Sequence, residues 1–251
     1  MHRRTFGICL AGLVLTGAAT PLQAPSKPSR PIRPAGANAQ YPEGTAVFFG
    51  CQPGGRTLDG SVSSPGNPFA TAFIATLKEP GLDFRRFAER LYDRTKEESR
   101  QFQLVDTPPK LEPASLALSP VPKTGTAVAL VLVVSSYRLD RQLPTLAGAR
   151  YDARRVAEAL AAAGYRTSTV LDTDRASIEE QLDAFAEESE SADIALIYTT
   201  GHGLEVGGIP YILMQDFDMD DGPDGLRHRA LPVSVIAAAA RARAANVVLS
   251  A

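Results

Sequence analysis

The feature that most constrains the fold is a short apolar run that ends at a glycine-flanked histidine. Residues 194–200 read Ile-Ala-Leu-Ile-Tyr-Thr-Thr, and Gly201, His202 and Gly203 follow directly. A short apolar run bounded by turn residues is typical of a strand buried in a parallel sheet. His202 would then lie just past the carboxyl end of the strand, where ligands and reactive groups collect in open α/β sheets. The two glycines allow a sharp turn and the close approach of a substrate.

Strand and helix patterns alternate around this run from residue 127 onward. We expect strands over 127–134, 166–171, 194–200 and 246–249, and helices over 152–163, after Asp174, and over 232–243. Strands that alternate with helices favour a mostly parallel sheet covered by helices on both faces. The predicted fold class is therefore α/β, a three-layer sandwich.

The first 44 residues have the composition of an export segment and a spacer. Arg3 and Arg4 precede an apolar stretch, and Ala24 closes a plausible cleavage site, so residues 1–24 are predicted to be a signal peptide. The paired arginines resemble a twin-arginine signal, which favours export to the periplasm or beyond. The alternative is a retained membrane anchor, although the stretch is shorter than a bilayer span. Residues 25–44 are predicted to be a proline-rich disordered spacer.

Ordered structure is predicted from Thr45, in two segments. The first, residues 45–106, should contain a strand over 46–49, a helix that opens at Pro68 and a second helix over 83–100. Residues 107–124 are again proline-rich and are predicted to link this segment to residues 125–251, which contain the alternating pattern.

Composition excludes several classes of partner. The formal net charge is −2 and the chain has no Trp, so nothing favours nucleic acid, or a membrane beyond the signal segment. The two cysteines are Cys9 and Cys51, and removal of the signal leaves Cys51 alone. The mature chain can therefore form no intramolecular disulfide, and Cys51 is either a reactive thiol or an inert buried one.

Several motifs together resemble the caspase and metacaspase family of cysteine peptidases. Residues 125–251 resemble the large-subunit segment in its bacterial style, through the phrase Leu-Ala-Gly-Ala-Arg-Tyr-Asp-Ala at 146–153 and the Tyr-x-x-Gly-His-Gly motif at 198–203. Residues 45–106 resemble the small-subunit segment, through the strand that ends in Cys-Gln-Pro-Gly at 51–54 and the Leu-Asp-Gly at 58–60. The resemblance implies a caspase-like sandwich and a cysteine-type endopeptidase.

The order of these two segments is the reverse of the family's. A circular permutation, with residues 107–124 as the new connection, explains the order and is tolerated where termini are close. The alternative is a truncated gene product or a mis-joined reading frame. In the family, the nucleophilic cysteine follows the histidine by roughly 50 residues. Counting on from His202 reaches Ser250 and Ala251, where this sequence has no cysteine.

The resemblance implies roles for His202, Gly203 and Asp152, and places Cys51 at a position that lines the substrate cleft. His202 would be the general base, and the backbone N–H of Gly203 would contribute to the oxyanion hole. Cys51 is a candidate substitute for the missing nucleophile; the alternative is an unreactive thiol. Asp152 matches the acidic residue that reads Arg or Lys before the cut, since a carboxylate pairs well with a guanidinium. The alternative for Asp152 is a favourable interaction with a helix N-terminus.

Two functions follow, an active peptidase or an inactive caspase-like protein that binds peptides or a partner protein. No cofactor is expected. An acidic run over 216–224, with Gly222, partly resembles a calcium loop but is predicted to be a solvated loop, as is the region of His228. The expected partner is a polypeptide, either as substrate or as bound protein.

Overall fold

The computed structural model describes residues 6–7, 39–61, 63–109, 111, 117–121 and 126–251. The signal peptide predicted over 1–24, apart from Phe6–Gly7, lies outside the described residues. So do most of the spacer predicted over 25–44 and part of the linker predicted over 107–124. Within the described residues, no helix is long and apolar enough to cross a membrane.

A five-stranded parallel sheet forms the centre of the fold. Its strands lie in the order β2 (Thr45–Phe49), β10 (Ala245–Ser250), β6 (Ile194–Thr200), β4 (Ala127–Val133) and β5 (Arg166–Leu171). Every residue of β4 and β6 is buried, which explains why these strands are almost wholly apolar. The polar sequence of β5 suits its place at the edge of the sheet, where its side chains are mostly exposed or half-buried. The predicted α/β class is confirmed.

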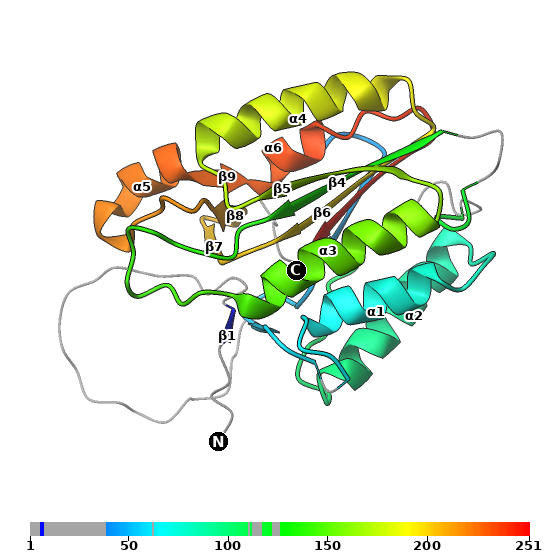
Figure 1. Cartoon of the computed structure of the whole chain (residues 1–251), viewed down its shortest axis with the longest axis horizontal. Helices are drawn as coiled ribbons and strands as arrows, with labels where there is room; N and C mark the ends of the chain where they lie inside the picture. The colour runs from blue at the N-terminus through cyan, green and yellow to red at the C-terminus, as the bar shows by residue number, and fades with distance from the viewer. Residues whose placement is uncertain (1–5, 8–38, 62, 110, 112–116, 122–125) are drawn as a thin grey trace.

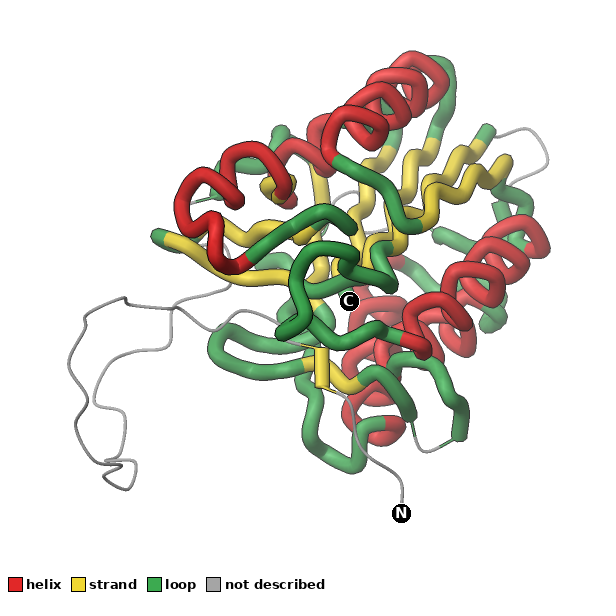
Figure 2. Tube along the Cα trace, turned by 60° about the vertical axis from the view of Figure 1, so that its left-hand side comes forward, coloured by secondary structure: helices red, strands yellow, loops and turns green. Residues whose placement is uncertain are grey.

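Helices cover both faces of the sheet (Figure 1). One layer contains α1 (Pro68–Leu77), α2 (Phe84–Glu98) and α3 (Ala147–Ala162), and the other contains α4 (Arg175–Glu190) and α6 (Val233–Ala238). Alternate side chains of each strand enter opposite cores: Leu196 and Tyr198 belong to the core under α1–α3, and Ile197 to the other. Figure 2 shows the strands between the two helical layers, with connections gathered around the end of the chain.

The N-terminal segment shares this sheet and this core. β2 pairs with β10 in parallel, with Phe49 opposite Ser250, and β10 in turn pairs with β6. The ring of Phe73 from α1 stacks on Tyr198 of β6, with centroids 6.1 Å apart. Residues 45–106 and 126–251 therefore fold as one unit, whatever the origin of their order along the chain.

α3 begins at Ala147, five residues before the predicted start. Its own N-cap residue, Leu146, makes no side-chain capping bond. Instead, the carboxylate of Asp59 accepts hydrogen bonds from the backbone N–H groups of Gly148 and Ala149, both at 3.0 Å. The sequence pattern could not show this cap, because Asp59 is about 90 residues away in the chain.

The acidic run over 216–224 is helical from Met219 onward, which corrects the prediction of a loop for that part of the run. Residues Met219–Asp221 form the short helix η1, and Gly222–Arg229 form α5, on which His228 is exposed. Arg229 neutralises part of the acidic run, with its guanidinium 2.6 Å from Asp221. Among the described residues, no group of three or more His, Cys, Asp or Glu side chains is arranged to hold a metal ion.

A second, three-stranded antiparallel sheet flanks the ends of the main strands. It contains β7 (Gly203–Val206), β8 (Ile209–Leu213) and β9 (Ala230–Pro232). α6 spans only Val233–Ala238, shorter than the helix predicted over 232–243, because Pro232 belongs to β9 and residues 239–244 form a turn and an irregular segment before β10. A two-residue ladder, β1 (Phe6–Gly7) with β3 (Thr57–Leu58), completes the strands.

Candidate functional site

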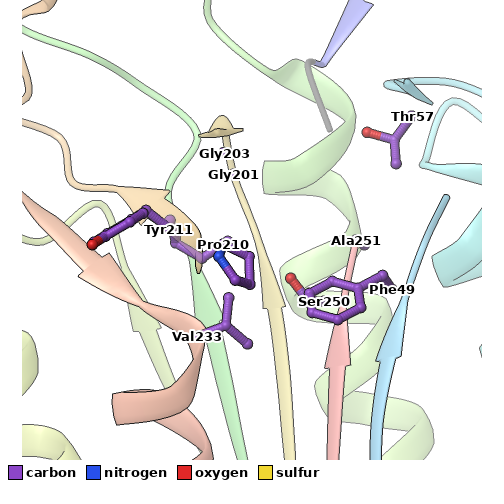
Figure 3. A pocket seen from close by; sticks show the side chains of 10 residues that line it. Phe49, Thr57, Gly201, Gly203, Pro210, Tyr211, Val233, Ser250 and Ala251 are labelled. Carbon is purple, nitrogen blue, oxygen red and sulfur yellow. The ribbon is translucent and has the colours of Figure 1, made fainter. Parts of the chain in front are cut away.

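A small pocket opens at the carboxyl ends of β2, β10 and β6. It encloses about 300 Å³, including space open to solvent, and none of the ten residues that line it has a charged side chain. Figure 3 shows Ser250 and Ala251 at the end of β10, between Phe49 of β2 and the turn with Gly201 and Gly203. The sequence pattern predicts a site at these carboxyl ends of the parallel strands.

His202 lies in the turn after β6 and is 1% exposed. Its Nε2 is 2.8 Å from the carbonyl oxygen of Pro144. A carbonyl only accepts, so Nε2 carries the proton and the neutral ring has a lone pair on Nδ1. Nδ1 is buried and makes no hydrogen bond to a described residue. His202 therefore holds the tautomer of a general base, with its basic nitrogen unoccupied by the described chain.

Electrostatics keep this imidazole neutral. Burial lowers the pKa of His202 from 6.5, and the bond to Pro144 and the negative charge of Asp140 oppose this shift in part. Asp140 is itself 4% exposed, and its carboxylate accepts backbone N–H groups of Gln142 at 2.6 Å and Met219 at 2.9 Å. At neutral pH the ring is thus in the form that can take up a proton.

Gly203 is the first residue of β7 and also lines the pocket. A Cβ at this position would lie 2.9 Å from the carbonyl oxygen of Tyr211, so the close pairing of β7 with β8 requires a glycine. The packing of β7 against β8 therefore explains why a glycine stands at position 203, and its role in an oxyanion hole stays a prediction.

Cys51 follows β2 and is 1% exposed. It packs in the same apolar core as Val47 and Phe49, on the α4–α6 face of the sheet. β10 lies between β2 and β6, and neighbouring strands are about 4.8 Å apart, so the ends of β2 and β6 are separated by about 10 Å. The thiol is thus at the same edge as His202 but two strands away.

The segment that carries Cys51 is held by Gln103. The fully buried side chain of Gln103 donates from Nε2 to the carbonyl of Gly50 at 2.8 Å and accepts the N–H of Leu58 at 3.0 Å. Gly50 also donates its N–H to the carbonyl of Ser250 at 2.7 Å. These bonds fix the wall of the pocket next to Cys51.

Asp152 is fully buried on α3 and is not among the residues that line the pocket. One oxygen accepts the backbone N–H of Asn67 at 2.6 Å, and the other accepts Nη1 of Arg155 at 2.8 Å. Burial raises its pKa to about 7, although both partners oppose the shift. Asp152 thus joins α3 to the start of α1, and its role in reading substrate stays a prediction.

Comparison with known families supports the resemblance over one part of the chain. Residues 126–225 match the caspase domain family. The match covers less than half of the chain and contains His202, Gly203 and Asp152, with strands β4 to β8. A caspase domain implies a caspase-like peptidase that acts on a polypeptide. No curated protein matches the chain. The small-subunit resemblance of residues 45–106 and the permuted order stay predictions.

No sequence pattern indicates the residues that hold His202. Pro144 and Tyr137 come from the connection between β4 and α3, where no periodic pattern indicates which backbone groups will face the histidine. Asp140 is one of many acidic residues, and only its burial in the fold distinguishes it.

Proposed function

We propose that the chain is a caspase-like cysteine-type endopeptidase in which His202 is the general base. The observation that carries this proposal is the tautomer of His202, with a proton on Nε2 and a buried Nδ1 that makes no hydrogen bond to a described residue. Most buried polar atoms of folded proteins are hydrogen-bonded, so this Nδ1 fits a nitrogen that takes up a proton. The caspase-domain match over residues 126–225 supports the same assignment.

The proposal implies a proton path. Nδ1 accepts the proton of a thiol, and the thiolate attacks the scissile carbonyl carbon. The imidazolium returns that proton to the leaving amine as the C–N bond breaks and a thioester forms. Water, deprotonated by His202, then hydrolyses the thioester and regenerates the thiol. The N–H of Gly203 would donate to the oxyanion in both steps.

Cys51 is our candidate for the thiol in a permuted chain. Its position supports this because β2 and β6 end at one edge of the sheet, on either side of β10. The separation of about 10 Å between these strand ends means that the two side chains must reach toward each other across β10. The alternative origin, a truncated gene product, predicts an in-frame cysteine codon after codon 251, and reading the DNA there decides between the two.

We further propose that Asp152 selects Arg or Lys before the cut. A buried carboxylate that already accepts a guanidinium is chemically suited to this role. The side chain of Arg155 would have to give way to the substrate's, and the contact with Asn67 would have to open. Asp152→Asn should abolish a preference for Arg and Lys, while a purely structural Asp152 would leave the preference unchanged.

The test is cleavage of fluorogenic peptides with Arg, Lys or Asp before the reporter group, using the purified chain without residues 1–24. Wild type is compared with His202→Ala, Cys51→Ala and the matched control His228→Ala, which removes an exposed imidazole on α5. Cleavage that is lost in the first two variants and kept in the third supports the proposal. Cleavage that survives His202→Ala contradicts it.

The second candidate function is a caspase-like protein that binds peptides without cutting them. The burial of Cys51 in an apolar core favours it, because desolvation disfavours the thiolate. An inert thiol should react with iodoacetamide no faster below neutral pH than the unfolded chain does. Peptide binding by a folded chain that cleaves nothing would establish this function.

We also propose that residues 1–24 direct export, as their sequence pattern predicts. Fractionation of cells that express the full chain, with Arg3 and Arg4 replaced by Lys in a second sample, tests this. Loss of export in the second sample would indicate the twin-arginine route.

A further inference from the structure

The connection between β4 and α3, residues 134–146, wraps around His202. Two of its residues contact the histidine from different sides: Pro144 accepts Nε2–H, and Tyr137 meets both the backbone and the ring. The role of His202 as base accounts for the contact with Pro144. The contacts of Tyr137 need an explanation of their own.

Tyr137 is 9% exposed, and its hydroxyl both accepts and donates a hydrogen bond. The oxygen accepts the backbone N–H of His202 at 2.6 Å, and its single proton points to the carbonyl of Val134 at 3.3 Å. The phenol ring lies against the imidazole, with centroids 4.8 Å apart and planes tilted by 49°. One side chain thus restrains the histidine at its backbone and at its ring.

The connection itself is anchored, so Tyr137 is held in place. The N–H of Arg138 donates to the carbonyl of Gln215 at 2.8 Å, and the N–H of Leu146 donates to the carbonyl of Ser135 at 2.8 Å. Between these points, Asp140 joins the connection to η1 through the N–H of Met219. Tyr137 therefore acts as part of a rigid frame.

We propose that Tyr137 is a positioning residue that holds the imidazole of His202 in the orientation and tautomer of a general base. The imidazole can rotate about two bonds, and the bond to Pro144 fixes only one ring nitrogen. The phenol ring blocks rotation away from Pro144, and the hydroxyl fixes the backbone from which the ring projects. The role rests on the proposed function, but the geometry can be tested without any substrate.

The test is ¹⁵N NMR of the histidine rings across pH in wild type, Tyr137→Phe and Tyr165→Phe. Tyr165→Phe is the matched control: its hydroxyl is also buried and donates to the carbonyl of Leu118 at 2.9 Å. Tyr165 precedes the amino end of β5, whereas His202 follows the carboxyl end of β6, so the two lie at opposite ends of the parallel sheet. The exposed His228 supplies a reference signal in each sample. Asp140 is the charged group that faces His202, and it is unchanged in all three.

In wild type and in Tyr165→Phe, His202 should be protonated on Nε2 and unprotonated on Nδ1. In Tyr137→Phe, the N–H of His202 loses its acceptor, and water must enter to replace it. The tautomers should then mix, and the pKa of His202 should rise toward its ordinary value, because water relieves part of the desolvation that lowers it. If Tyr137→Phe leaves both the tautomer and the titration of His202 as in wild type, the proposal is wrong.

A nuclear Overhauser contact in wild type and the kinetics of peptide cleavage provide two further tests. If Tyr137→Phe does not fold, wild type alone must show a nuclear Overhauser contact between the Tyr137 and His202 rings, and its absence overturns the proposal. Where wild type cleaves peptides, Tyr137→Phe should lower kcat about tenfold with KM nearly unchanged, since the base is misplaced after binding. A wild type that cleaves nothing refutes the peptidase function but leaves the NMR result on Tyr137 standing.

Discussion

Replacement of Asp59 by Ala should destabilise the whole fold, because Asp59 caps a helix that belongs to the other segment of the chain. Its carboxylate accepts two N–H groups in the first turn of α3, at 3.0 Å each. Hydrogen bonds to a charged group contribute about 1.5–3 kcal/mol each, and loss of a capping side chain typically costs about 0.5–2 kcal/mol. Burial of the carboxylate raises the pKa of Asp59 and offsets part of this gain. We therefore expect a loss of about 2 kcal/mol, or about 4–8 °C in Tm.

The assay is urea unfolding followed by circular dichroism, with two comparisons. Asp174→Ala removes an ordinary local cap, in which the carboxylate accepts the N–H of Ser177 at 2.8 Å at the exposed start of α4, and should cost about 1 kcal/mol. Asp59→Asn keeps an acceptor and should lie between wild type and Asp59→Ala. If Asp59→Ala lowers the free energy of unfolding by less than Asp174→Ala does, then the bonds from Asp59 to the start of α3 do not hold the two segments together.

Three further predictions concern the same helix and the site. Gly148→Ala should destabilise the protein by about 1–3 kcal/mol in urea unfolding, because the added Cβ would lie 1.8 Å from the carbonyl oxygen of Asp59. Helix propensity alone predicts a gain of about 1 kcal/mol, and such a gain would contradict this contact. Burial raises the pKa of Asp152 to about 7, so the folded state binds a proton on this carboxyl more tightly than the unfolded state does. The stability of wild type relative to Asp152→Asn should therefore be constant below about pH 4 and fall as the pH rises to 7. A relative stability that rises over that window would show that Asp152 is ionised in the fold. Because burial lowers the pKa of His202, kcat/KM for peptide cleavage should persist below pH 6.5 before it declines, and a decline centred above 6.5 would place His202 in a solvated setting.

The sequence predicts the sheet well because parallel strands must be apolar on both faces. The apolar run predicted as a strand over 127–134 is the observed β4, and the run over 194–200 is the observed β6. The cap at Asp174 is also confirmed, since its side chain accepts the N–H of Ser177. These elements are set by residues close to one another in the chain, which is the information a periodic pattern contains.

Two of the misses share one physical cause, namely contacts between residues distant in sequence. The early start of α3 depends on Asp59, and the restraint of His202 depends on Tyr137 and Pro144, 65 and 58 residues away. α5 was missed because its proline and glycines indicate a loop, whereas the ion pair between Arg229 and Asp221 helps to hold a helix there. A resemblance to a family located His202, but only the fold shows what orients it.

The most direct test of the account is covalent trapping with a peptide that ends in Arg and carries a thiol-reactive chloromethyl ketone. Intact mass is measured for wild type, His202→Ala and His228→Ala after the same exposure, and the modified residue is then located by digestion. We predict one adduct per chain, on a cysteine, that forms in wild type and His228→Ala and is lost in His202→Ala. An adduct that forms equally fast without His202, or no adduct on the folded wild type, would contradict the assignment of His202 as the base of a cysteine peptidase.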